Sequence, residues 1–273
     1  MGIELGKLGV WRMAAGVDAA FAAEVEKLGY GTIWLGGSPG GDLAIVDELL
    51  AATDRITVAT GIVNIWADAP ESIAKAFHRI EGKHPGRFVL GVGAGHREHT
   101  QEYKKPYVAL VEYLDALDKA GVPKESRALA ALGPKVIELA RDRTAVVHPY
   151  LTTPEHTRAA HESIGSAALL APEQKVVFDT DPERARATAR ETVAFYLGLS
   201  NYTANLRKHG FSEEDVAGTG TDRLVDALAL HGDGKALAAG LQAHLDAGAD
   251  HVSVQALGAD PFPAYRAIAA ELL

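Results

Sequence analysis

A run of alternating glycines followed by a histidine is the part of this sequence best suited to hold a ligand. The glycines are Gly91, Gly93 and Gly95, and the histidine is His96. Residues 87–92, which include Gly91, are mostly apolar and predict a buried strand that ends in these glycines. Glycines at the carboxyl end of a strand let backbone N–H groups approach an anion or a flat ring without a Cβ atom in the way. A tight turn without a ligand has the same pattern, and the dinucleotide fingerprint is absent because no helix opens on G-x-G-x-x-G here.

Two histidines fall at the ends of predicted strands. His96 could act as an acid, a base or a hydrogen-bond donor to a substrate. His148 closes a later strand and, by its place in the chain, faces the same side. Each has an alternative interpretation, since His96 can be a solvent-exposed loop residue and His148 can be a strand end capped by the following Pro149. The chain has 11 histidines, so the residue type alone singles out neither.

A second glycine turn, Gly133-Pro134, lies between a predicted strand and a predicted helix. The start of a helix presents free N–H groups and the positive end of the helix dipole, so a phosphate could bind there. An ordinary tight turn is the alternative. The three tryptophans, Trp11, Trp34 and Trp66, also fall near strand ends, where they can pack in the core or line a site for a flat heterocycle.

Composition excludes several classes of function. With no cysteine, the chain of 273 residues has no disulfides, thiolate chemistry or Cys-ligated metal. A net charge of −9 without a Lys/Arg block argues against nucleic-acid binding. No run is long enough to span a bilayer and no signal peptide opens the sequence, so we expect a cytoplasmic protein. The histidine spacing predicts no metal site, and neither a serine-hydrolase elbow nor a Walker loop occurs.

Strand and helix patterns alternate along almost the whole chain. Strands are expected at 7–11, 31–35, 56–63, 87–92, 128–132, 144–148, 175–178 and 251–257. Most are followed by a helical pattern, expected at 17–28, 42–52, 70–81, 107–120, 134–141, from 153 onwards, at 182–196 and at 263–273. This alternation predicts parallel strands joined by right-handed crossovers. Residues 200–230 break the rhythm with helix signals and no clear strand, which predicts a helical insertion before the last strand.

Eight strand–helix units in this length predict a single TIM (β/α)8 barrel, with residues 1–273 as one domain. In that fold the carboxyl ends of the strands form one face, where ligands bind. Gly36-Gly37, Gly61, the segment 93–96 and Gly133 would then share this face. A doubly wound sheet is the alternative, and it would bring only the strand ends beside its switch point to a ligand.

Two longer stretches resemble a known family. Residues 55–64, containing T-G-I-V, are followed by Ala69-Pro70-Glu71 at a helix start and then by G-R-F-V-L-G-V-G-A-G at 86–95. Residues 130–134, A-A-L-G-P, give a second match. These motifs resemble the luciferase-like monooxygenase superfamily, TIM barrels that bind FMN or the deazaflavin coenzyme F420. The likeness covers nearly the whole chain and is closest to the deazaflavin-dependent branch, which includes methylenetetrahydromethanopterin reductases and glucose-6-phosphate dehydrogenases.

The resemblance implies a set of site residues. In this branch a non-prolyl cis peptide in the third strand supports the coenzyme ring, and the match places it at Gly61–Ile62. The contacts to the coenzyme phosphate fall on the turns that follow strands four and five. Together with the glycines on the same face, the expected cofactor-binding residues are Gly36, Gly61, Ile62, Gly93, Ala94, Gly95, Leu132 and Gly133. The sugar-phosphate dehydrogenases carry an Asp-His pair after strand two, where this chain has Gly36-Gly37-Ser38, and a glutamate where it has His96.

The resemblance therefore implies an F420-dependent oxidoreductase that transfers a hydride between the coenzyme and a small organic substrate, with His96 as proton donor or acceptor. An FMN-dependent monooxygenase is the alternative enzyme. A cofactor-binding relative without turnover is the alternative from another class. The expected partners are a small-molecule substrate and, as an open expectation, a second copy of the chain in a homodimer, with neither nucleic acid nor membrane.

Overall fold

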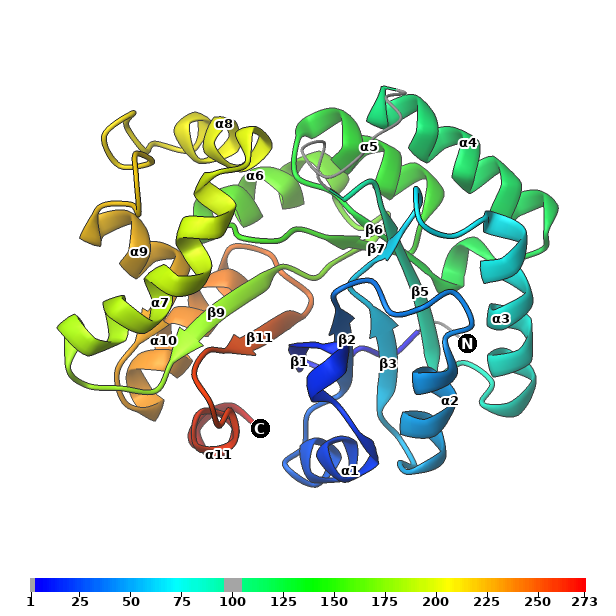
Figure 1. Ribbon diagram of the computed structural model, residues 1–273, viewed down its shortest axis with the longest axis horizontal. Helices are drawn as coiled ribbons and strands as arrows, with labels where there is room; N and C mark the ends of the chain where they lie inside the picture. The colour runs from blue at the N-terminus through cyan, green and yellow to red at the C-terminus, as the bar shows by residue number, and fades with distance from the viewer. Residues whose placement is uncertain (1–2, 96–104) are drawn as a thin grey trace.

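We analysed a computed structural model, which describes residues 3–95 and 105–273 (Figure 1). Its strands are β1 (Leu8–Met13), β2 (Thr32–Gly36), β3 (Thr57–Thr60), β4 (Val63–Asn64), β5 (Phe88–Gly93), β6 (Arg127–Ala130), β7 (Val146–His148), β8 (Leu169–Leu170), β9 (Glu173–Val177), β10 (Ala229–His231) and β11 (Val252–Ala256). Every pairing among them is parallel. The predicted parallel α/β arrangement is confirmed.

The helices lie outside the sheet and surround it (Figure 1). They are α1 (Ala19–Lys27), α2 (Ala44–Ala51), α3 (Pro70–Lys83), α4 (Pro106–Lys119), α5 (Pro134–Arg143), α6 (Pro154–Ile164), α7 (Pro182–Leu197), α8 (Ser200–Lys208), α9 (Asp222–Leu228), α10 (Gly234–Asp246) and α11 (Phe262–Leu272). Helices α3 to α7 each begin with a proline. Proline fits that position because its fixed φ suits a helix and its missing N–H leaves no donor unsatisfied.

The sheet curls back on itself into a TIM-like barrel. Its hydrogen-bonded order is β10-β9-β11-β1-β2-β3-β5-β6-β7-β8. Only Ala171 and Pro172 separate β8 from β9, and the N–H groups of Ala171 and Glu173 still donate to carbonyls of the β7 segment, at Val147 and Pro149. Strands β8 and β9 are therefore two stretches of one barrel strand, which joins β7 to β11. Strand β4 likewise continues β3 beyond Gly61–Ile62, and the short β10 is added beside β9.

Packing on both faces explains why β2 and β5 read as nearly continuous apolar runs, since every one of their residues is buried. Every residue of β9 is buried as well, although this strand begins with the polar residues Glu173, Gln174 and Lys175. The apolar faces of the helices pack on the outside of the barrel, as Ile73, Phe77 and Ile80 do on α3. Residues 200–230 form α8, α9 and the start of β10. Helices α7 to α9 share a separate hydrophobic cluster, to which Val193, Leu206 and Leu224 belong.

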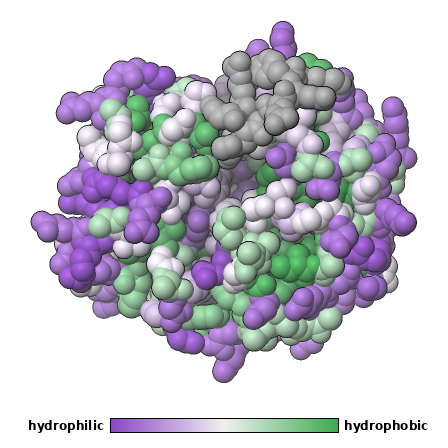
Figure 2. Space-filling model, in the orientation of Figure 1, coloured by the Kyte–Doolittle hydropathy of each residue, from purple (hydrophilic) through white to green (hydrophobic). Residues whose placement is uncertain are grey.

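The left of the molecule in Figure 2 is strongly hydrophilic over α7 and α9. Arg186 on α7 forms ion pairs with Asp222 and Asp226 on α9, at 2.9 and 2.6 Å. Arg190, one turn further along α7, pairs with Asp222 at 2.5 Å. The two helices therefore meet through apolar side chains on the inside and charged pairs on the outside.

The structure differs from the expectations at α10, at β10 and at the start of α2, and it also contains the short strand β8, which was not predicted. Helix α10 was not predicted, because His244 and Gly240 interrupt the apolar pattern that indicates a helix. Its start does have a cap, since the Asp233 side chain accepts from Ala236 N at 2.9 Å. Strand β10 lies at the end of the segment expected to hold no strand. The helix expected at residues 42–52, which would begin at Asp42, starts at Ala44. The cap position is Leu43 with φ 50°, and the Asp42 carboxylate accepts from Ala44 N at 3.2 Å.

Candidate active site

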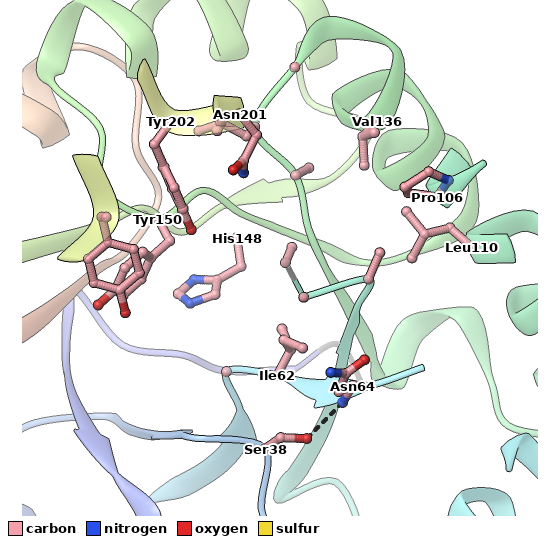
Figure 3. Close-up of a pocket in the computed structure, with 18 of the residues that line it drawn as sticks. Ser38, Ile62, Asn64, Pro106, Leu110, Val136, His148, Tyr150, Asn201 and Tyr202 are labelled. Atoms are coloured by element: carbon pink, nitrogen blue, oxygen red, sulfur yellow. Dashed lines mark hydrogen bonds between the residues drawn. The ribbon is translucent and has the colours of Figure 1, made fainter. Parts of the chain in front are cut away.

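A cavity of about 710 Å³ opens at the carboxyl ends of the barrel strands (Figure 3). Its volume is in the range of small-molecule sites. Pro106, Leu110 and Val136 form an apolar side, and aromatic residues face them from the end of β7 and from α8. The complete lining is Trp11, Met13, Gly37, Ser38, Gly61, Ile62, Asn64, Ala94, Gly95, Pro106, Leu110, Ala130, Ala131, Leu132, Gly133, Val136, His148, Tyr150, Tyr196, Ser200, Asn201, Tyr202 and Asn205.

Most of the expected cofactor-binding residues line this cavity. They are Gly61, Ile62, Ala94, Gly95, Leu132 and Gly133. Gly36 and Gly93 lie behind the lining. A Cβ on Gly36 would stand 2.1 Å from the Trp11 ring, and one on Gly93 would stand 3.0 Å from the Ile62 side chain, so both glycines make room for a lining residue. His96, the expected catalytic residue, lies outside the described residues.

The peptide between Gly61 and Ile62 is cis, as the resemblance implied. Gly61 lines the cavity beside the side chains of Trp11 and His148. A Cβ added to Gly61 would stand 2.8 Å from Trp11 Nε1 and 3.5 Å from His148 Nε2. Any larger side chain at this position would therefore displace the indole of Trp11.

The turn after β5 is held by a hydrogen bond from Trp66, a residue that does not line the cavity. Trp66 Nε1 donates to the carbonyl of Ala94 at 2.7 Å. The amide oxygen of Asn64 in turn accepts from Trp66 N at 3.0 Å, and Ser38 Oγ accepts from Asn64 N at 2.9 Å (Figure 3). In a trans peptide the N–H of the next residue points opposite to the carbonyl. Trp66 therefore directs the N–H of Gly95 away from itself.

The turn after β6 is fixed in the same way. His156 Nε2 donates to the carbonyl of Leu132 at 2.9 Å, which directs the N–H of Gly133 away from the histidine. Gly133 is the N-cap residue of α5, and no side chain caps this helix. Space around Gly133 is open, because a Cβ added there would meet no atom within 4 Å. The residues present thus fit an anionic group between Gly95 and Gly133, since two glycine turns and a helix start lie on one cavity wall.

The aromatic wall holds His148 in one orientation. Its ring stacks on Trp34, with ring centres 4.1 Å apart and planes 7° apart. Trp34 Nε1 donates to His251 Nε2 at 3.0 Å, and His251 Nδ1 donates to the carbonyl of Gly6 at 2.8 Å. His148 Nδ1 donates to the carbonyl of Ala171 at 2.7 Å. Burial lowers the pKa of His148 to about 4, so the imidazole is neutral at physiological pH.

A buried ion pair lies beside this wall. Lys175 Nζ is 3.0 Å from both carboxylate oxygens of Glu173 and 3.9 Å from the centre of the Tyr150 ring. Both charged side chains are almost completely buried, at 0% and 1% exposure. Burial raises the pKa of Glu173 and lowers the pKa of Lys175, while their mutual attraction opposes both shifts. The Tyr150 hydroxyl donates to Gln255 Oε1 at 2.9 Å, so this pair and Gln255 position the ring that lines the cavity.

Sequence patterns had indicated only part of this site. The role of Trp11 depends on its contact with Gly61, and that of His148 on its stack with Trp34, and neither contact has a local sequence signal. The wall supplied by α8, with Asn201 and Asn205, lies in the segment treated as an insertion.

Within residues 3–95 and 105–273, no three potential metal ligands lie close enough together to hold a metal ion. In the same ranges, no helix is long and apolar enough to cross a membrane.

Comparisons with known proteins agree with this geometry. The family model described as luciferase-like monooxygenase matches residues 14–126. A 5,10-methylenetetrahydromethanopterin reductase of Archaeoglobus fulgidus is 26% identical over 204 residues, covering 62% of this chain. That match spans 61% of the relative's length. The chain is thus similar to the luciferase-like monooxygenases over this part of its length, as its motifs predicted.

Solved structures share the fold over nearly the whole chain. An F420-dependent secondary alcohol dehydrogenase in complex with an F420–acetone adduct superposes with a TM-score of 0.76, at 15% identity and 98% coverage of both chains. The oxygenating constituent of 3,6-diketocamphane monooxygenase from Pseudomonas putida, in complex with FMN, superposes with a TM-score of 0.68, at 14% identity and 96% coverage of both. The predicted TIM-barrel fold is confirmed by these similarities.

Proposed function

We propose that this chain, a relative of the luciferase-like monooxygenases, is an oxidoreductase that binds coenzyme F420 and transfers a hydride between it and a small organic substrate. The observation that supports this most directly is the pair of glycine turns on one wall of the cavity. Their carbonyls, at Ala94 and Leu132, are held by Trp66 and His156. Those bonds leave the N–H groups of the turns to face a phosphate.

In this proposal the remaining expected residues hold the rest of the coenzyme. Ile62 and Gly61 form the support for its ring, with Gly36 behind Trp11 and Gly93 behind Ile62 making room for them. The coenzyme supplies the carbon that accepts or gives the hydride. His96 stays the proposed proton donor or acceptor next to the turn after β5. A cytoplasmic location and a homodimer remain expectations that accompany this function.

FMN binding with monooxygenase activity is the second candidate, because the FMN-bound neighbour has the same fold. We favour F420 because the relative from A. fulgidus is a methylenetetrahydromethanopterin reductase and its sequence match includes more than half of this chain. The third candidate is a relative that binds a cofactor but catalyses no reaction. Titrating the purified protein with each cofactor, followed by fluorescence, separates these candidates, and a subsequent survey of substrates distinguishes an enzyme from a binding protein.

The phosphate site can be tested with two matched glycine variants. Gly133→Asp adds a negative charge in open space beside the turn. Repulsion between unit charges 4 Å apart is about 1 kcal/mol in water and about 4 kcal/mol at an effective dielectric of 20. The affinity for F420 should fall between about fivefold and several hundredfold, and less at high salt. Gly82→Asp on α3 adds the same charge where a Cβ also has open space, away from the cavity, and should leave the affinity unchanged. Equal affinities in the two variants would place the phosphate elsewhere.

A further inference from the structure

Helix α8 carries an asparagine on its buried side. The buried residues of this helix are Tyr202, Asn205 and Leu206. Tyr202 and Leu206 belong to the hydrophobic cluster that α8 shares with α7 and α9. A leucine in place of Asn205 would suit this side of the helix, and leucine also favours a helix more than asparagine does. The asparagine is therefore unfavourable for folding, which indicates that its amide serves a ligand.

The side-chain amide of Asn205 lines the cavity and forms no hydrogen bond with a described residue. The residue is 9% exposed. Its backbone carbonyl is used within the helix, where it accepts from His209 N at 3.1 Å. Asn64 in the same lining differs, because its amide oxygen accepts from Trp66 N at 3.0 Å. Buried polar groups in native proteins have a partner, so the Asn205 amide calls for a ligand group or a water molecule in the cavity.

Asn201 adds a second amide to the same wall. It precedes Asn205 by four positions, so the two side chains lie on one face of α8 with their Cβ atoms about 5–6 Å apart. Both residues line the cavity, and Figure 3 shows the Asn201 amide pointing into it. The two amides therefore give this wall of the cavity a strip of hydrogen-bonding groups.

The chemistry of an amide decides which ligand group fits this strip. A side-chain amide presents an N–H donor and a carbonyl acceptor side by side. A carboxylate only accepts and an ammonium group only donates, so each would leave one of the two unpaired. A hydroxyl group donates and accepts through a single atom. A carboxamide has its own N–H and carbonyl at the same spacing, so it can form two parallel hydrogen bonds with an asparagine.

The charge of the cavity wall favours a neutral group as well. Among the described residues that line the cavity there is no Asp, Glu, Lys or Arg. Burial lowers the pKa of His148 to about 4, so this imidazole is neutral at physiological pH. An ionised group placed against α8 would therefore lose water without gaining an opposite charge from these residues.

We propose that Asn205, with Asn201 beside it, selects a substrate that carries a neutral carboxamide group. The Asn205 amide donates to the carbonyl oxygen of this group and accepts from its N–H. The inference rests on the proposed function, in which the coenzyme is held by Gly61, Ile62 and the glycine turns after β5 and β6. Those contacts come from the barrel, so α8 is the part of the wall that is left to face the substrate.

The test compares benzamide with acetophenone in the protein loaded with oxidised F420. The two probes have the same shape, and acetophenone has a methyl group where benzamide has its NH2, so it keeps the carbonyl and loses the donor. Ligand-observed NMR titrations give both dissociation constants. The wild-type protein should bind benzamide about threefold to tenfold more tightly, the usual value of one hydrogen bond. Benzoate, which is ionised, should bind more weakly than benzamide.

Two variants assign this preference to Asn205. Asn205→Leu keeps the size of the side chain and should bring the preference for benzamide close to one. Its free energy of unfolding in urea should not decrease, because the amide has no partner among the described residues, whereas a structural role would make the variant less stable. Asn205→Ala should lose the preference in the same way and replaces the leucine variant if that one does not fold.

Ala204→Leu is the matched control, because it places the same leucine on an exposed position of α8 outside the cavity lining. It should keep the wild-type preference. The inference is overturned if the wild-type protein binds both probes equally, since a water molecule alone then meets Asn205. It is also overturned if the preference persists in Asn205→Leu, or if this variant loses affinity for F420 and keeps the preference, since the amide then contacts the coenzyme.

The same samples separate this inference from the proposed function. F420 affinity is measured by fluorescence titration, and the probe titrations are repeated without F420. Binding of F420 without a preference for benzamide refutes only the carboxamide site. A preference that depends on Asn205 in a protein that does not bind F420 supports the carboxamide site and refutes the proposed function.

Discussion

The indole nitrogen of Trp66 is hydrogen bonded to the carbonyl oxygen of Ala94 at 2.7 Å. This bond joins the segment after β4 to the turn after β5, two places where the chain approaches the cavity. The backbone of Trp66 is itself held by the side chain of Asn64. The glycine turn is therefore positioned by a side chain that does not line the cavity.

Replacing Trp66 with phenylalanine should weaken cofactor binding without unfolding the protein. The substitution keeps an aromatic ring but leaves the carbonyl of Ala94 without its donor, so the orientation of the Gly95 N–H is no longer fixed. We expect a loss of affinity of about threefold to tenfold, the usual value of one hydrogen bond. The measurement is a fluorescence titration with F420, with thermal unfolding as a control. An unchanged dissociation constant would show that the turn keeps its shape without Trp66.

Substituting Gly61 with valine should have a larger effect on the same titration. Its Cβ would stand 2.8 Å from Trp11 Nε1, closer than real Cβ contacts, and the branched side chain has few alternative rotamers. The indole must move, and both cofactor affinity and stability should fall. Overpacking of this kind costs about 1–3 kcal/mol. Gly61→Ala should give a smaller loss of both, and a valine variant that binds F420 like the wild type would contradict the role of Gly61 in supporting the ring.

Stability should decrease in mild acid because four histidines are buried in the neutral form. Burial lowers the pKa of each of them, His148, His156, His244 and His251, to about 4. The unfolded chain binds protons below pH 6.5, where the folded protein does not, so stability is full above pH 6.5 and is lost as the pH falls towards 4. Each histidine contributes a slope of up to about 1.4 kcal/mol per pH unit in this window.

Urea unfolding at pH 7.5, 6.0 and 5.0 measures this slope. The free energy of unfolding should fall at each step. A curve that is flat down to pH 5 would mean that these imidazoles are protonated in the folded protein or exposed to water.

The ion pair of Glu173 and Lys175 should be far more costly to break than to replace. Lys175→Met leaves the Glu173 carboxylate buried without its cation, accepting from the N–H of Leu151 at 3.2 Å, and should cost about 3–5 kcal/mol. The double variant Glu173→Gln/Lys175→Met removes both charges and should recover a large part of this loss. Urea unfolding of the three proteins gives the comparison. A double variant no more stable than Lys175→Met would argue that the pair contributes packing and not charge neutralisation.

Patterns of neighbouring residues predicted most elements of the barrel, because apolar residues recur at different spacings in strands and in helices. The start of α7 was predicted from Pro182 and confirmed. Strand β8 was missed because Pro172 interrupts the run before β9, and only the hydrogen bonds to the β7 segment show that both belong to one barrel strand. The expected phosphate turns at Gly95 and Gly133 do line one cavity. That they bind a phosphate stays a prediction.

What could not be predicted depends on contacts between distant segments. Trp11 and Tyr150 are 139 positions apart in the sequence, yet their ring centres lie 5.2 Å apart in the cavity wall. The stack of His148 on Trp34 needs the barrel to bring β2 and β7 across its interior. Neither pair has a spacing that a periodic pattern could reveal. The family resemblance placed the cis peptide at Gly61–Ile62, which no property of those two residues alone would have indicated.

Helix α8 has a consequence for how this scaffold can diversify. It closes one side of the cavity with Asn201 and Asn205, yet its apolar face belongs to the cluster it shares with α7 and α9. The barrel core is a different cluster. In the proposed function, side chains on α8 that face the substrate can therefore be exchanged without repacking the core of the barrel. This part of the cavity wall and the strands of the barrel can thus change independently of one another.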